Sequence, residues 1–198
     1  MAEIKSTMDM VLERAARMAA AAPATEADNE DLTKKGMRLA ADYLNRKEID
    51  LSKELAGQPA KDQADVRKGM AQTLLRNIVL PRSPELQASG ELAVQGVLAL
   101  AGKTKEIGTI CRELEQILKQ YGQHKEQMTQ QLDDAIRAQL EQQGAARGQT
   151  GKMGKINPAM HPQYREELGR MMTGLNNQYN DAMDQRKDSI LQLFSAAR

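Results

Sequence analysis

The chain has 198 residues, a formal net charge of +1 at pH 7, one cysteine and no tryptophan. This length fits one domain or slightly more, and the balanced charge gives no global field that would recruit nucleic acid or an anionic membrane. With one phenylalanine and four tyrosines, the core has to be assembled from aliphatic residues and twelve methionines. That supply favours helices over sheets, since pleated surfaces are rich in aromatic and β-branched side chains.

The compartment can be predicted from what the chain lacks. A lone cysteine, Cys111, cannot form an intramolecular disulfide, which fits a reducing compartment. Asp9 and Glu13 interrupt the N-terminal stretch where a secretory signal needs an apolar core. No uninterrupted apolar run reaches membrane-spanning length. We therefore predict a cytoplasmic protein that does not cross a membrane.

The N-terminal section is predicted to be a series of short helices. Helical spacing of apolar residues runs from Ser6 to Ala22, where Pro23 ends it, and Thr25 starts a second helix with acidic residues in its first turn. The buried stripe expected on this second helix is Leu32, Gly36, Leu39, Ala40, Tyr43 and Leu44.

Two more short helices should precede residue 82. One follows Asp50 and stops at Gly57, and Pro59 is expected to open the next. Its apolar residues recur every fourth position until Pro81. These are Val66, Met70, Leu74 and Ile78.

After Pro81 the pattern changes to a long helical repeat. Ser83 and Pro84 form a strong N-cap and first-turn pair. A seven-residue apolar repeat follows at Leu86, Ala93, Leu100, Ile107, Leu114, Tyr121, Met128 and Ala135. The preserved phase favours one helix over 84–143 with a coiled-coil-like seam, while Gly102 is a candidate break because glycine weakens a helix interior by about 1 kcal/mol.

A glycine-rich loop over 144–160 is predicted to precede a last long helix. That helix has an apolar stripe, interrupted only by Arg186, at positions closer to an eleven-residue than to a seven-residue repeat. The stripe is Tyr164, Leu168, Met171, Leu175, Tyr179, Ala182, Ile190, Leu193 and Ala197.

These elements predict an all-α, elongated helical bundle. Residues 83–198 would form a long antiparallel, coiled-coil-like helical hairpin, closed by the loop, and the short helices of residues 1–82 would pack on its side.

The string GQTGK in the loop invites comparison with a phosphate-binding loop. The comparison fails because Ala146 stands where a glycine is needed, Met153 follows Lys152, and no strand precedes it. A weaker alternative is that Arg147, Lys152 and Lys155 contact the phosphate backbone of a nucleic acid, although no aromatic residue in the loop could stack on bases.

No metal, cofactor or catalytic site is predicted. A di-iron site would need Glu-x-x-His pairs, but Tyr121 precedes His124 by three residues and Pro158 precedes His161 by three. We expect His124 at the edge of the seam or in solvent, and His161 at the start of the last helix. Cys111 lies on the apolar side of its helix and is expected to be a small buried hydrophobe.

The opening segment AEIKSTMDMVLERA resembles the start of small uncharacterised bacterial proteins. The match covers little more than the first expected helix, and it implies neither an activity nor residue roles.

Two hypotheses for the function follow. The first is a non-enzymatic assembly or adaptor protein that binds itself or another helical protein through helix-helix contacts. The second is an RNA- or phosphate-binding protein that uses the basic loop at 144–155. An enzyme is the third option, and it would need a concave polar pocket, which a sequence cannot reveal.

Overall fold

The computed structural model describes residues 29–45, 47–102, 104–146 and 157–196. Every regular element within these ranges is a helix, and the same ranges contain no strand. The all-α prediction is therefore confirmed. The helix predicted over Ser6 to Ala22 lies outside the described residues. Among the described helices, none combines the length and apolar character needed to cross a membrane.

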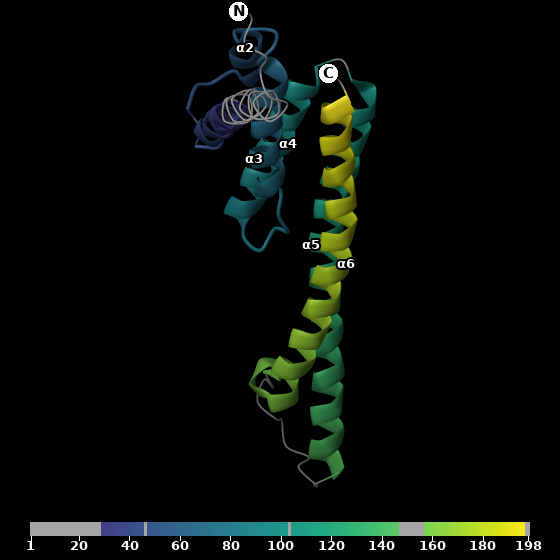
Figure 1. The fold of residues 1–198 in the computed structure, drawn as a ribbon. Coiled ribbons are helices and arrows are strands. Elements are labelled where there is room, and N and C mark those ends of the chain that lie inside the picture. Colours follow the sequence, from purple (N-terminus) through teal and green to yellow (C-terminus); the bar gives the residue numbers. More distant parts are fainter. Residues whose placement is uncertain (1–28, 46, 103, 147–156, 197–198) are drawn as a thin grey trace, which may run out of the picture.

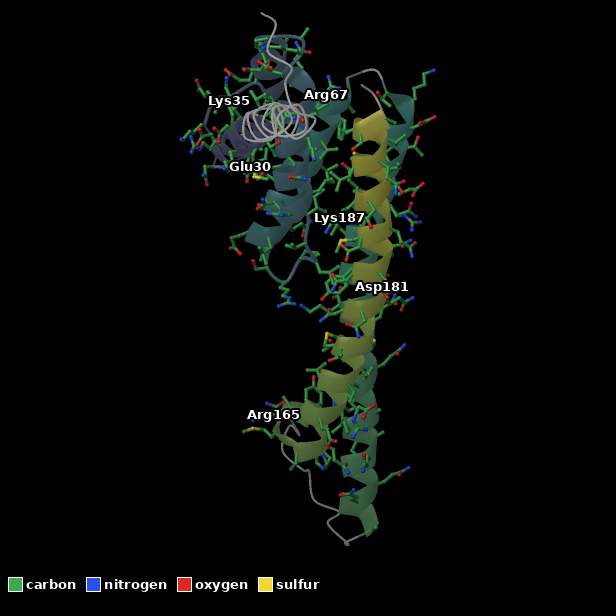
Figure 2. The ribbon with its side chains drawn as sticks, viewed as in Figure 1. Glu30, Lys35, Arg67, Arg165, Asp181 and Lys187 are labelled. Carbon is green, nitrogen blue, oxygen red and sulfur yellow. The ribbon has the colours of Figure 1, made fainter. Side chains whose placement is uncertain are left out.

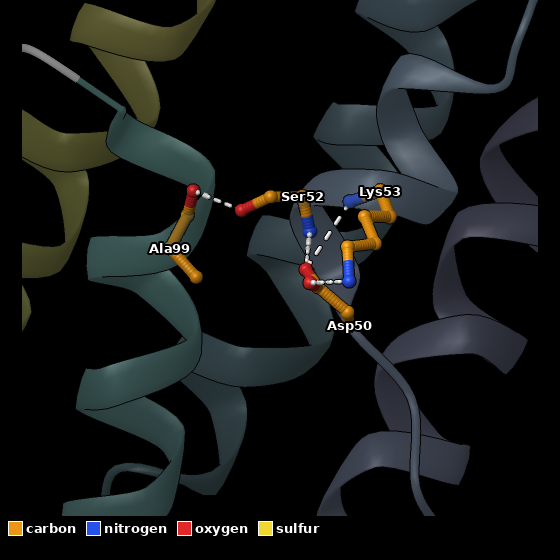
Figure 3. A network of polar contacts seen from close by, with 4 residues as sticks. All are labelled: Asp50, Ser52, Lys53 and Ala99. Carbon is orange, nitrogen blue, oxygen red and sulfur yellow. Dashed lines mark hydrogen bonds and ion pairs between the residues drawn. The ribbon is translucent and has the colours of Figure 1, made fainter.

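The first described helix spans residues 29–44, followed by α2, Leu51–Ala56, and α3, Gln63–Asn77. Asp50 caps α2 as predicted, because its Oδ1 accepts from the backbone N–H groups of Ser52 and Lys53 at 3.0 and 3.2 Å (Figure 3). The hydroxyl of Ser52 donates to the carbonyl of Ala99 at 2.9 Å and so ties α2 to the next helix.

Pro59 does not open α3 directly, so that prediction was wrong by four residues. Residues 60–62 form a turn in which the backbone N–H of Asp62 donates to the carbonyl of Pro59 at 2.8 Å. The helix begins only after this turn is complete. Its predicted apolar side is nevertheless confirmed, since Val66, Met70 and Leu74 are fully buried.

The helix at 29–44 crosses α3 through two glycines. A Cβ atom on Gly36 would lie 2.0 Å from the carbonyl oxygen of Val66, and a Cβ on Gly69 would lie 2.0 Å from that of Thr33. The backbones approach so closely because neither crossing residue has a side chain. Two members of the predicted stripe, Gly36 and Ala40, are buried, and the other four are partly buried against the core.

The long repeat after Pro81 forms two helices, α4, Pro84–Ala101, and α5, Lys105–Ala146. Ser83 caps α4, with Oγ accepting from the N–H of Leu86 at 3.4 Å. The chain turns back at Gly102, whose φ of 58° is readily adopted by glycine. The single helix favoured by the repeat was therefore wrong, and the alternative of a break at Gly102 is confirmed.

Helix α6, Pro162–Ala196, runs antiparallel to α5 along most of its length (Figure 1). Three cross-helix pairs show the direction, because the pair formed earliest in α5 lies latest in α6. They are Glu113 with Arg186 at 3.2 Å, Tyr121 with Asn176 at 2.9 Å and His124 with Tyr179 at 2.6 Å. The one charged residue in the apolar stripe of α6, Arg186, thus meets a carboxylate on α5.

Helices α2, α3 and α4 gather at one end of the α5–α6 pair, and the opposite ends of α5 and α6 extend beyond them (Figure 1). Helix α3 packs on α6 and α4 packs on α5. Lys187 lies on the side of α6 that faces these helices (Figure 2), and its side chain is only 17% exposed. One continuous core, from Ala40 to Ile190, joins the short helices to the long pair.

A second, smaller core holds the extending ends of α5 and α6 together. It consists of Leu132, Ile136 and Tyr164, with Leu140, Leu168 and Met171 packed against them. The seven-residue repeat had placed Ala135 in the seam, but Ala135 is exposed. A straight helix of 3.6 residues per turn drifts away from a seven-residue repeat, so the buried side moves to Leu132 and Ile136.

The predicted loop over 144–160 was too long at both ends. Residues up to Ala146 belong to α5, and Pro158–Met160 form a single 3-10 turn. Asn157 caps this turn by accepting from the N–H of Ala159 at 3.1 Å. Helix α6 begins at Pro162, so His161 lies at the start of the last helix, as expected.

We expect Gly36→Ala to destabilise the protein by about 1–3 kcal/mol or more, because the new methyl group would overlap the backbone of α3. Gly169→Ala is the control, since a Cβ at Gly169 meets no atom within 4 Å and should stabilise α6 by up to about 1 kcal/mol. Urea unfolding followed by circular dichroism measures both. Equal stability of Gly36→Ala and the parent chain would contradict the close crossing.

Candidate functional site

A groove of about 730 Å³ lies between α4 and α5, beside the segment that joins α3 to α4. Each helix contributes one row of side chains to it. The lining residues are Pro81, Gln87, Glu91, Gln95, Glu115, Leu118, Lys119, Gly122, Gln123 and Glu126.

The spacing of the lining residues along α4 and α5 puts each row on one side of its helix. Gln87, Glu91 and Gln95 are each four residues apart, so they share one side of α4. On α5 the row from Glu115 to Glu126 spans eleven residues, or three turns and about 16 Å at 1.5 Å per residue. The groove is therefore long and narrow.

The floor of the groove is formed where α4 and α5 touch. Leu118 is buried, and its Cδ1 would lie 3.8 Å from a Cβ on Gly90 of α4. Further along α5, a Cβ on Gly122 would meet no atom within 4 Å. The wall beside Gly122 is therefore open space that a bound molecule could fill.

The groove is acidic and polar. Three glutamates, Glu91, Glu115 and Glu126, face one lysine, Lys119, which gives a formal charge of −3 + 1 = −2. The amide Nε2 of Gln87 donates to Oε1 of Glu91 at 3.0 Å. Side chains of this kind recognise cations and the hydrogen-bonding groups of a polar ligand.

A smaller hollow of about 350 Å³ lies on the other side of the same row of α4. Tyr43 and Lys47 line it together with Leu92, and it shares Glu91 and Gln95 with the groove. Burial raises the pKa of the Tyr43 phenol above its usual value, so this hydroxyl stays protonated at neutral pH.

Two tyrosines form the polar centre of the α5–α6 interface. The hydroxyl of Tyr121 donates to Oδ1 of Asn176 at 2.9 Å, and the hydroxyl of Tyr179 lies 2.6 Å from Nδ1 of His124. The two phenol rings meet edge to face with centroids 5.5 Å apart. His124 is exposed at the edge of this interface, as the sequence had indicated.

The histidines and acidic side chains of the described residues do not gather into a metal site. Among the described residues, no group of three or more His, Cys, Asp or Glu side chains is placed to hold a metal ion. Asp134 lies 3.9 Å from Arg137, and Glu166 pairs with Arg170, so these two carboxylates are surface charges that pair within their own helices.

Cys111 is fully buried, which confirms the sequence interpretation. Burial, with a smaller contribution from the nearby Glu115 carboxylate, raises the pKa of its thiol to about 11. A thiol with this pKa is almost entirely protonated at neutral pH and makes a poor nucleophile.

The basic residues proposed to contact phosphate, Arg147, Lys152 and Lys155, lie outside the described residues. Phosphate or RNA binding by this segment therefore stays a prediction. The groove, in contrast, was missed by sequence reasoning, because its two rows of side chains lie on the segment that the repeat favoured as one helix.

The protein is of the all-α class. Short helices pack on a long antiparallel pair through one core, and a second core joins the far ends of that pair. The chain belongs to the DUF6657 family, a family of unknown function whose sequence profile matches residues 52–192. This agrees with the expectation of an uncharacterised family, although the match does not include the N-terminal segment on which that resemblance was based. No curated protein and no solved structure matches the chain significantly.

We expect Cys111 to stay unmodified when the native protein is treated with Ellman's reagent at about pH 8, since a thiol with a pKa of about 11 is about 99.9% protonated there. The same reagent should react with one thiol per chain in guanidinium chloride. Stoichiometric reaction of the native protein within minutes would contradict both the burial and the raised pKa.

We expect Tyr121→Phe and Asn176→Ala each to lower the free energy of unfolding by about 1 kcal/mol, because each leaves a partner without its hydrogen bond. In the double variant the losses should not add, and the coupling energy should be about 0.5–1.5 kcal/mol. Thermal unfolding of the four proteins of this cycle measures it. Fully additive losses would show that the two groups do not interact.

Proposed function

We propose that this protein is a non-enzymatic assembly or adaptor protein that holds a helical segment of a partner in the groove between α4 and α5. The observation that carries this proposal is the groove itself, a long hollow of about 730 Å³ lined by side chains from two helices. Its length of three turns along α5 suits a helix, which makes contacts at regular intervals along its axis.

The burial of the apolar stripes on α5 and α6 supports the choice of the groove as the binding surface. The stripes on α5 and α6 are covered by each other and by the short helices, so they are not free to bind a partner. Most of the side chains that line the groove are polar or charged. Interfaces that form and dissociate have about the same polarity as the rest of a protein surface, so a polar groove suits a reversible partner.

A non-enzymatic role is supported by the environment of the reactive groups. Glu91, Glu115 and Glu126 are exposed to solvent, whereas catalytic carboxylates generally depend on a desolvated position. Cys111 is held as a protonated, buried thiol. The lone cysteine also supports a cytoplasmic setting for the proposed role.

A photo-crosslinking experiment in the native cell tests the proposal. A benzophenone side chain is introduced at Gln95 or Gln123, inside the groove, and at Gln178 on the exposed side of α6 as the matched control. We expect irradiation to join the groove positions to a protein, either another chain or a second copy, while the control position gives no such adduct.

Mass spectrometry of the adducts then identifies the partner and the crosslinked segment. Adducts of equal yield at Gln178 and at the groove positions would contradict the assignment of the surface. The absence of any protein adduct at Gln95 and Gln123, together with a monomer in light scattering, would overturn the adaptor role.

A further inference from the structure

We infer that the partner segment held in this groove is a basic helix, with lysine or arginine side chains along the side that faces α4 and α5. This inference rests on the proposed function and names the chemistry of the partner. It is drawn from the charge, the shape and the side-chain chemistry of the groove.

The charges of the groove are arranged on both walls. Glu115 and Glu126 lie three turns apart on α5, and Glu91 lies on α4 across from them. A helix laid along the groove brings residues three turns apart to the two glutamates of α5, and residues between them to Glu91. Cationic side chains at those positions would each meet a carboxylate.

The shape of the groove favours a helix over a small polycation such as a polyamine. Small ligands generally occupy enclosed pockets that bury most of their surface, whereas this groove is open along one side and its glutamates are exposed. A helix about 10–12 Å in diameter would cover an open groove of this kind from above. It would exclude water from the carboxylates, which strengthens their attraction to cations.

Pro81, Leu118 and three glutamines complete the surface. The glutamine amides of Gln87, Gln95 and Gln123 can donate and accept hydrogen bonds, so they tolerate both polar side chains and the long stems of lysine or arginine. Leu118 and Pro81 offer apolar contact to the same stems, which are hydrocarbon up to the charged group.

A second copy of the described helices fits the groove less well. Several basic side chains on these helices already lie beside a carboxylate of their own helix. The pairs are Lys34 with Glu30, Arg137 with Asp134, Arg170 with Glu166 and Lys187 with Asp184. A partner whose cations are not paired in this way has more to gain from the groove.

The test uses the full chain and two synthetic peptides. Both are helical alanine and leucine peptides of about 18 residues, or about 27 Å of helix, with either lysines or glutamates along one side and a fluorescent label. Fluorescence anisotropy should show that the lysine peptide binds and the glutamate peptide does not. Binding should weaken when the salt is raised from about 50 to about 300 mM, since exposed charges are then more strongly screened.

Matched variants separate the groove from general attraction between opposite charges. The variant Glu91→Gln, Glu115→Gln, Glu126→Gln should bind the lysine peptide at least about tenfold more weakly, because three charge pairs are lost. The control Glu141→Gln, Asp181→Asn, Asp188→Asn removes the same charge from exposed positions outside the groove, and should change binding less than about threefold.

A second pair of variants tests the shape without changing the charge. Gly122→Leu should fill the open space in the groove wall and weaken binding at least about tenfold, while improving the helix propensity of α5. Gly169→Leu makes the same change at an open position outside the groove and should bind like the parent chain.

Several outcomes would overturn the inference. Equal losses in the two charge variants, or unchanged binding by Gly122→Leu, would show nonspecific attraction. Spermine that binds the groove in place of the lysine peptide would identify a small polycation site instead. If the peptide fails but crosslinks form at Gln95 and Gln123, the adaptor role stands and only the basic helix is excluded. If the peptide binds but no crosslink forms and light scattering shows a monomer, the adaptor role is removed.

Discussion

The apolar stripe along α6 has to be covered, and the way it is covered determines the rest of the molecule. Helix α6 is 35 residues long, and burying its stripe against α5 and α3 removes a continuous apolar surface from water. The one charged residue in that stripe, Arg186, is accommodated by Glu113 of α5. Helix α6 covers one side of α5, and α4 packs against another side. The groove lies along the line where α4 and α5 meet.

Gly102 is the second constraint, since the groove exists only because the chain reverses there. An uninterrupted helix over 84–143 would carry Glu91 and Glu115 far apart along one rod. Reversal at Gly102 folds α4 back onto α5, so that rows of side chains from both helices line the same hollow. The contact between Gly90 and Leu118 then sets the distance between the two rows.

Local signals predicted much of this fold, because caps and apolar spacing act within a few turns. Asp50 caps α2 and Ser83 caps α4, at the two places where the sequence predicted a helix to begin. Gly36 and Ala40 are buried, as predicted. The seven-residue repeat could not show whether residues 84–143 form one helix or two. Two antiparallel helices that pack on each other have the same spacing of apolar residues as one continuous helix. The groove was missed for the same reason, since its two rows become neighbours only after the reversal.

For the proposed adaptor role, the few apolar side chains exposed among the described residues favour a reversible partner over a permanent one. An obligate interface resembles a domain core and presents a large apolar face in the separated chain. Among the described residues, the large apolar side chains that are exposed are Val79, Leu86, Leu98 and Met160. In the proposed role, a docking surface that combines this limited apolar area with three carboxylates would gain much of its selectivity from charge, and a partner recognised in that way can be released as readily as it binds.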